Sequence, residues 1–397
     1  MVHRRHGSSS SAASWLGWIA AFVAVLAGCI GPHGRSEATA PRSSGAEAAP
    51  ALRVYEHLAM GTLFRLTLCA SDPDLADRAA AAAFRRVDGV ERVATDYKAT
   101  SEARRLPAAS SGQWVEVSAD LGRVLGASKL LVEASQGAFD PTVGALTRHW
   151  RRALRRHRWP APSVWEGASR LVGWDEQVSY EDDGVRRRCR VRDPELRLDF
   201  GGVAKGVAVD EALAVVEALG IHRALMDGGG DLRALDPPPG ADGWRVEVLP
   251  FGQNSTTRLR FLLARAAIAT SGDTYQSGAL EGSPLEGLAG AGVEGAAMHY
   301  GHVIDPLSRL PLISPRASVM TAATAAEADA LATARLVIGP METGRVALER
   351  GLFFGGEDQE PCVGRHFPHD GAVPLPTVTP NAAPSRSNES LLRHRDE

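Results

Sequence analysis

Two kinds of hydrophobic periodicity alternate along the middle of the chain. Residues 63–69 alternate between apolar and polar positions, which predicts a strand. Residues 75–93 are rich in alanine and place apolar residues at helical spacing, which predicts a helix. The same spacing predicts three more helices, at residues 121–135, 205–219 and 325–337.

Short apolar runs predict the remaining strands. They lie within residues 165–191, at 196–200 and at 223–226, and the runs at 245–249 and 258–263 are expected to pair. Strands and helices follow one another without a steady strand–helix–strand repeat. We therefore predict an α+β fold, with mixed sheets and packed helices, rather than a doubly wound sheet.

The N-terminus has the layout of an export signal. Arg4 and Arg5 precede an apolar run at 15–26, which is shorter than the ~20 residues that a membrane-spanning helix needs. The run ends in Leu-Ala-Gly-Cys29, which resembles the bacterial lipobox. We predict a lipoprotein signal peptide over residues 1–28 and a lipidated Cys29, which anchors the protein in the bacterial cell envelope, facing the periplasm or the exterior. An ordinary signal peptide or a short anchor helix is the alternative.

Composition separates the two ends from a folded middle. Residues 29–51 lack apolar periodicity and predict a flexible tether, and residues 363–397 predict a disordered tail. The intervening residues 52–362 predict one folded domain, and the 44% hydrophobic content of the chain suffices for its core.

A net charge of −3 gives no field that favours nucleic acid, so we predict no nucleic-acid partner. The basic segment 148–158 is interpreted as a solvated helix end or an insertion, with a phosphate or membrane patch as the alternative.

A glycine-rich turn is the first candidate for chemistry. Asp199 ends a predicted strand, Gly201 and Gly202 turn the chain, and a helix begins near Lys205. Such a turn exposes bare backbone to a ligand, and the N-terminus of the helix favours an anion such as a phosphate. The order of residues is neither GxGxxG nor a Walker loop, so a simple tight connection is the structural alternative.

Two further pairs of residues have spacings that suit a site. Asp329 and Thr333 are four residues apart and share one face of the predicted helix. Their oxygens are hard ligands of the kind that Mg²⁺ prefers, although a solvent-facing Asp and a Thr bonded to its own helix would show the same spacing. His302, three residues before Asp305, can move a proton or contact a phosphate, and a structural histidine is the alternative.

The order of the short motifs is more informative than any one of them. They are MGT at 60–62, AFDPT at 138–142, DFGGVAKGVAVD at 199–210, GGD at 229–231, ATSG at 269–272, HVID at 302–305 and ADALAT at 328–333. In this order they resemble the ApbE-like family of FAD:protein FMN transferases, from Met60 to about Gly351. The resemblance implies an ApbE-like fold with a cleft for FAD between subdomains.

The resemblance also implies roles for single residues. It places flavin- or adenine-nucleotide contacts at Met60, Tyr97, Ala138, Phe139, Asp140, Asp199, Lys205 and Ile304. It places Mg²⁺ on the side chains of Asp329 and Thr333 and on backbone oxygens of Gly202 and Ala332. His302 is the candidate for removing the proton of the acceptor, with Asp305 or the metal as alternatives.

The implied reaction uses Mg²⁺, cleaves FAD, attaches FMN through a phosphoester bond to a threonine of a target protein and releases AMP. Hydrolysis of FAD to FMN and AMP, or FAD binding by a lipoprotein without catalysis, are the alternatives. The chain departs from the family pattern at Arg309, where Gly is usual, and in a Gly- and Ala-rich stretch at 277–297. We therefore expect the surface that faces the target protein to differ.

Overall fold

The computed structural model describes residues 49–252, 255, 257–272, 278–279, 299–339, 351–355 and 362–363. The predicted signal peptide, Cys29, most of the tether and the tail from residue 364 lie outside these residues, as does most of the stretch 277–297. Within the part that is described, no helix has both the length and the apolar character needed to cross a bilayer.

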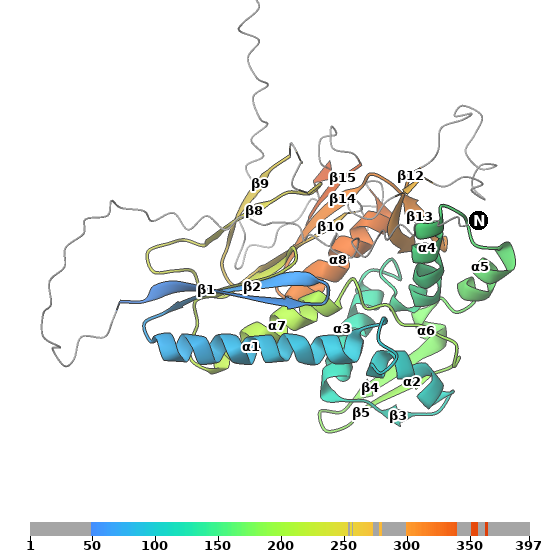
Figure 1. The fold of residues 1–397 in the computed structure, drawn as a ribbon, viewed down its shortest axis with the longest axis horizontal. Helices are drawn as coiled ribbons and strands as arrows, with labels where there is room; N and C mark the ends of the chain where they lie inside the picture. The colour runs from blue at the N-terminus through green and yellow to red at the C-terminus, as the bar shows by residue number, and fades with distance from the viewer. Residues whose placement is uncertain are drawn as a thin grey trace, which may run out of the picture.

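An eight-stranded antiparallel sheet forms the centre of the molecule (Figure 1). Its strands, in spatial order, are β1 (Ala51–Ala59), β2 (Thr62–Ala70), β6 (Ala224–Gly228), β7 (Asp231–Ala234), β10 (Ala267–Gly272), β14 (Ala317–Ala322), β15 (Gly351–Phe354) and β16 (Cys362–Val363). Alternation along β2 buries Phe64, Leu66 and Leu68 completely, which confirms the predicted strand. The sequence patterns did not predict β1, which pairs with β2 along its whole length.

Helices cover one face of this sheet. Helix α1 (Pro73–Ala94) packs on α7 (Ala204–Ala218), α7 packs on β6 and on α8 (Ala325–Ile338), and α8 packs on β10 and β14. The faces in contact are rich in alanine, so the helices approach one another closely. All three predicted helices are confirmed.

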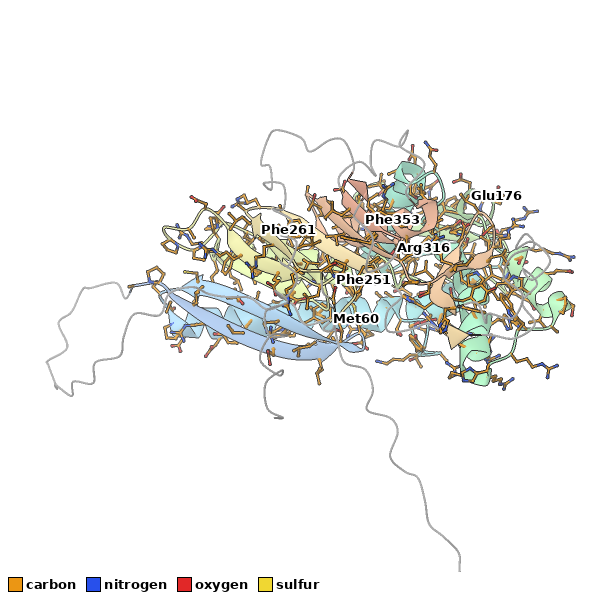
Figure 2. The ribbon with its side chains drawn as sticks, turned by 90° about the horizontal axis from the view of Figure 1, so that it is seen from above. Met60, Glu176, Phe251, Phe261, Arg316 and Phe353 are labelled. Atoms are coloured by element: carbon orange, nitrogen blue, oxygen red, sulfur yellow. The ribbon has the colours of Figure 1, made fainter. Side chains whose placement is uncertain are left out.

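A two-stranded hairpin covers the opposite face of the sheet. Strands β8 (Trp244–Val248) and β9 (Leu259–Leu263) pair as expected from the sequence. Phe251 and Phe261, labelled in Figure 2, belong to a second hydrophobic core between this hairpin and the sheet. The strands from β6 to β15 are therefore buried on both faces, whereas one face of β1 is exposed.

A second group of elements packs near one end of α1 and α8 (Figure 1). It consists of α2 (Glu102–Ser110), β3 (Val115–Glu116), α3 (Ala119–Ala134), a 3₁₀ turn at Pro141–Val143, α4 (Gly144–Arg156), α5 (Pro162–Ser169), α6 (Trp174–Gln177), β4 (Val178–Asp182), β5 (Arg187–Val191), β11 (Gly278–Ala279), β12 (His299–Asp305) and β13 (Leu310–Ile313). The predicted helix at 121–135 corresponds to α3 and is confirmed.

The α+β prediction is confirmed. Every strand pair in the described residues is antiparallel, so no sheet there combines parallel and antiparallel strands. Strands β4 and β5 confirm the strands predicted within residues 165–191, although residues 165–177 fold largely as α5 and α6. One local prediction is wrong. Residues 196–200 form no strand, because the Asp199 amide donates to the Pro141 carbonyl, in a turn, instead of to a neighbouring strand.

Candidate functional site

Four of the motifs meet around one side chain, that of Thr333 on α8. A Cβ atom on Gly202 would lie 2.8 Å from Thr333 Oγ1 and 3.4 Å from Phe139 Cε2. Thr333 Oγ1 also lies 3.2 Å from the hydroxyl of Ser271, at the end of β10. The glycine turn, the AFDPT segment, the ATSG strand end and the ADALAT helix therefore converge on one small region, and only glycine fits at position 202.

Helix α7 fixes the position of α8 through the motif that follows the glycine turn. The Asp210 carboxylate accepts hydrogen bonds from the amides of Ala325 (2.9 Å) and Ala326 (3.0 Å), at the N-terminus of α8. It also pairs with Arg233 at 2.8 Å. Gly206 lies so close to the Ala325 backbone that a side chain there would clash. The motif at residues 199–210 thus forms the glycine turn and also positions α8, the helix that faces this turn.

Lys205 supplies a partly buried positive charge beside this region. Its ammonium group contacts Asp231 and lies 3.3 Å from Asp329 Oδ2. Asp231 and Asp329 are almost fully buried. Burial alone would lower the pKa of Lys205, but the two carboxylates outweigh it and hold the pKa above its ordinary value. The cluster therefore keeps a permanent cation next to the glycine turn.

The residues predicted to hold Mg²⁺ lie together. Thr333 faces the glycine turn from α8, Asp329 lies 3.4 Å from the Gly206 amide, and the Ala332 carbonyl accepts from Ser318 Oγ at 2.6 Å in addition to its bond within the helix. No group of three or more His, Cys, Asp or Glu side chains suited to a metal exists among the described residues. One carboxylate with neutral oxygens nevertheless suits Mg²⁺, which takes its remaining ligands from water and substrate phosphates. The donors present fit the ion.

His302 is buried near the same cluster. Its Nδ1 atom has no hydrogen-bond partner within the described part of the chain. Burial, and then the positive charge of Arg151, lower the pKa of His302 to about 4. Its ring is therefore neutral at neutral pH, and a neutral imidazole can accept a proton.

Asp305 has a different setting from His302. Its Oδ1 atom accepts from the Leu307 amide at 2.8 Å, and its carbonyl accepts from the Arg309 amide at 2.7 Å. These bonds close the turn between β12 and β13, where Arg309 adopts a positive φ of 60°. The structure thus gives Asp305 a role in the turn and explains why glycine would suit position 309.

An ion-pair network joins Asp199 to Tyr97. Arg151 on α4 contacts Asp199 at 3.2 Å and Asp96 at 2.9 Å, and its guanidinium lies 5.0 Å from the centre of the Tyr97 ring. Tyr97 is 71% exposed, so its ring is available to a planar ligand. Asp199 and Tyr97, both predicted nucleotide contacts, are therefore connected through one arginine.

The remaining predicted contacts are mostly held within the fold. Ala138, Phe139 and Ile304 are buried. Asp140 accepts from the Thr142 amide and hydroxyl and from the Trp174 amide, at 2.7 to 2.9 Å, so its side chain organises the turn. Met60 forms the turn between β1 and β2 with a φ of 51°, and its amide donates to Glu91 (Figure 2).

Three residues of the site were not among the predicted ones. Asp231 and Ser271 belong to the GGD and ATSG motifs, so their place in these motifs was an available signal. Arg151 lies in the basic segment 148–158, and the interpretation of that segment as solvated is wrong for this residue. Its charge is held between two carboxylates of distant segments, which no local pattern records.

Comparisons with known proteins agree with this geometry. A curated FAD:protein FMN transferase of Klebsiella pneumoniae (strain 342) is 25% identical over 333 residues, 83% of this chain and 90% of the relative. The Escherichia coli (strain K12) FAD:protein FMN transferase is 25% identical over 302 residues, 75% of this chain and 82% of the relative.

Solved structures show the same fold. The apo flavinyl transferase ApbE of Pseudomonas stutzeri superposes with a TM-score of 0.63 at 23% identity, covering 77% of this chain and 91% of that one. The flavin transferase ApbE of Vibrio cholerae gives the same TM-score and identity, over 77% of this chain and 93% of the other. The model of the ApbE family matches residues 60–352, which hold all seven motifs, and the chain therefore belongs to the ApbE family.

Proposed function

We propose that this chain is a Mg²⁺-dependent FAD:protein FMN transferase. It would split FAD, transfer FMN to a threonine hydroxyl of a target protein and release AMP. The observation that carries the proposal is the contact of Gly202 with Thr333, beside the Lys205–Asp329 pair. The activity printed for the curated relatives agrees with it.

The residues of the site suit a pyrophosphate substrate. Lys205, protonated between Asp231 and Asp329, and the N-terminus of α7, which begins at Ala204, both stabilise negative charge at the glycine turn. Asp329, Thr333 and the carbonyls of Gly202 and Ala332 would hold Mg²⁺, which would add to the neutralisation of phosphate charge. Positioning and neutralisation account for most of the catalysis of phosphoryl transfer.

His302 is the proposed acceptor of the proton from the threonine hydroxyl. Its ring is neutral, and its Nδ1 atom, which has no hydrogen-bond partner among the described residues, can accept a proton. Asp305 is less suited, because its Oδ1 already accepts a bond in its own turn. Tyr97 and Asp199 would contact the nucleotide from the side of α4, where Arg151 holds them in place.

The central experiment compares Asp329→Asn with the wild-type chain. Full-length protein is mixed with FAD, Mg²⁺ and a target protein of a known family member, and mass spectrometry records the gain of one FMN on a threonine. We expect Asp329→Asn to lose at least roughly 100-fold in rate, since it removes the one charged ligand of the ion. Glu327→Gln, which neutralises a carboxylate two residues away on the same helix, is the matched control.

The outcomes separate the alternatives. Release of free FMN and AMP without a target protein would favour hydrolysis. FAD that remains intact while bound would favour a binding protein without catalysis. A wild-type rate and an unchanged Mg²⁺ requirement in Asp329→Asn would contradict the proposed metal site.

We also propose that the protein is a lipoprotein that Cys29 anchors in the bacterial cell envelope. The support is the apolar run at 15–26, followed by the lipobox-like Leu-Ala-Gly-Cys29. Mass spectrometry of the mature N-terminus tests this. A diacylated Cys29 that is lost in Cys29→Ser is the expected result, and an unprocessed or unmodified Cys29 would contradict it.

A further inference from the structure

A cavity of about 340 Å³ lies beside α4 and carries an unusual concentration of positive charge. Six arginines line it, and we call it the arginine pocket: Arg104, Arg148, Arg151, Arg152, Arg155 and Arg197. Among the described residues, Asp96 is the only acidic one that lines it, and its carboxylate is bound to Arg151. No other carboxylate in the described part of the chain lines the pocket to balance the charge of the other five arginines.

Three separate elements build the arginine pocket. Arg148, Arg152 and Arg155 are four and three residues apart, so they share one face of α4. Arg104 comes from α2, and Arg197 comes from the segment that leads to the glycine turn. Arg104, Arg148 and Arg197 are partly buried, in contrast to the solvated face of an ordinary basic helix. Their convergence is a property of the tertiary structure.

The electrostatics of the pocket show an unbalanced field. Burial, and then the positive charges of Arg104 and Arg148, lower the pKa of Arg197 to about 10. Burial and the charges of Arg152 and Arg104 also lower the pKa of Arg148. Among the described residues, neither side chain forms an ion pair. Like charges held this close repel one another, and a bound anion would relieve the repulsion.

We propose that the arginine pocket binds a phosphate-bearing anion other than FAD. Guanidinium groups match the oxygens of a phosphate in two-pronged hydrogen bonds, and several converging arginines favour an anion with more than one charge. The volume is at the small end of the range for ligand sites, about 300–1,000 Å³, and suits a compact group. The same chemistry is found in a free diphosphate and in the headgroup of an anionic lipid.

The inference does not depend on the proposed transferase activity. The pocket borders the proposed nucleotide site at Tyr97 and Arg151, but its other five arginines are not among the residues that the family resemblance assigns to FAD. The test is therefore performed without FAD and with a chelator, so that neither the flavin nor a divalent ion takes part.

In the first arm, calorimetry measures the binding of inorganic pyrophosphate to the full-length protein in neutral detergent. We expect saturable binding to the wild type and a loss on the order of 100-fold in Arg148→Gln/Arg152→Gln, since each bond between charged groups contributes roughly tenfold or more. The control Arg156→Gln/Arg158→Gln removes the same charge at the C-terminal end of α4 and just after it, from residues that do not line the pocket. The melting temperature of the pocket variant should not fall, because the substitution removes repulsion.

The second arm uses full-length protein in vesicles of phosphatidylcholine, with or without phosphatidylglycerol. Protection of Arg148 and Arg152 from a dicarbonyl reagent, read by mass spectrometry, is expected only with phosphatidylglycerol if a lipid headgroup is the ligand. Binding of pyrophosphate without lipid protection identifies a free phosphate compound instead. The proposal is overturned if neither arm shows binding, or if the pocket and control variants lose affinity equally.

Discussion

Thr333 and Gly202 are 131 positions apart in the sequence, yet a Cβ atom on Gly202 would lie 2.8 Å from the Thr333 hydroxyl. The contact exists because Asp210 caps α8 and because Gly206 lets α7 and α8 approach closely. The relation between the two residues is therefore set by helix packing. It brings the Gly202 backbone and the Thr333 hydroxyl close to α8, where the Asp329 carboxylate contacts the partly buried Lys205.

We predict that Gly202→Ala abolishes most activity while the protein stays folded. The added methyl group would press on the Thr333 hydroxyl and on the Phe139 ring, so the turn or the threonine must shift. A displacement of about 1 Å costs on the order of 100-fold in rate. Transfer kinetics and a thermal melt measure the two effects. Gly167→Ala on α5, where a Cβ meets no atom within 4 Å, is the control and should retain full activity.

We predict that Asp210→Ala lowers both stability and activity. The change removes the acceptor of two amides at the start of α8 and the partner of Arg233, which together should cost about 2–4 kcal/mol. Urea unfolding measures the loss. Asp72→Ala, which removes the N-cap of α1 alone, should cost ~1 kcal/mol and leave turnover unchanged. Equal effects of the two variants on turnover would contradict the positioning role of Asp210.

We predict that Arg151→Met destabilises the fold by about 3 kcal/mol, because it leaves Asp96 and Asp199 as neighbouring, partly buried carboxylates without a countercharge. Burial and the charge of Asp199 already raise the pKa of Asp96, so the loss should shrink as the pH falls and Asp96 takes up a proton. Chemical unfolding at neutral and mildly acidic pH checks this. The exposed Arg156→Met is the control, and a similar loss there would show that the charge pair is not the cause.

We predict that His302 makes the fold sensitive to acid. The folded-state pKa of His302 is about 4, against an ordinary value of 6.5, so between these pH values the unfolded chain binds a proton that the folded chain does not. The free energy of unfolding should therefore fall by up to ~3 kcal/mol as the pH drops through this window. His302→Gln should remove that slope. The exposed His222→Gln is expected to keep it, and a wild-type slope in His302→Gln would refute the assignment.

The sequence patterns predicted those elements whose signal is local. Helix α8 follows from its apolar spacing, and β2 from its alternation. The failures occurred where tertiary contacts replaced a local signal. The pattern at residues 196–200 predicted a strand, but the Asp199 amide donates a hydrogen bond to the Pro141 carbonyl, in a turn. Strand β1 was missed although it pairs fully with β2, and its apolar residues Leu52, Val54 and Leu58 lie on an exposed face rather than in the core.

By itself, the sequence determined the helical spacing that puts Asp329 and Thr333 on one face, the bare backbone at Gly202 and the order of the seven motifs. Only the tertiary structure decided that Lys205 is held between Asp231 and Asp329, that Arg151 joins Asp96 to Asp199, and that distant arginines share one pocket. The physical reason is the distance along the chain over which each kind of interaction acts. Periodicity and capping act over a few residues, whereas charge and burial act through space between segments that the fold brings together.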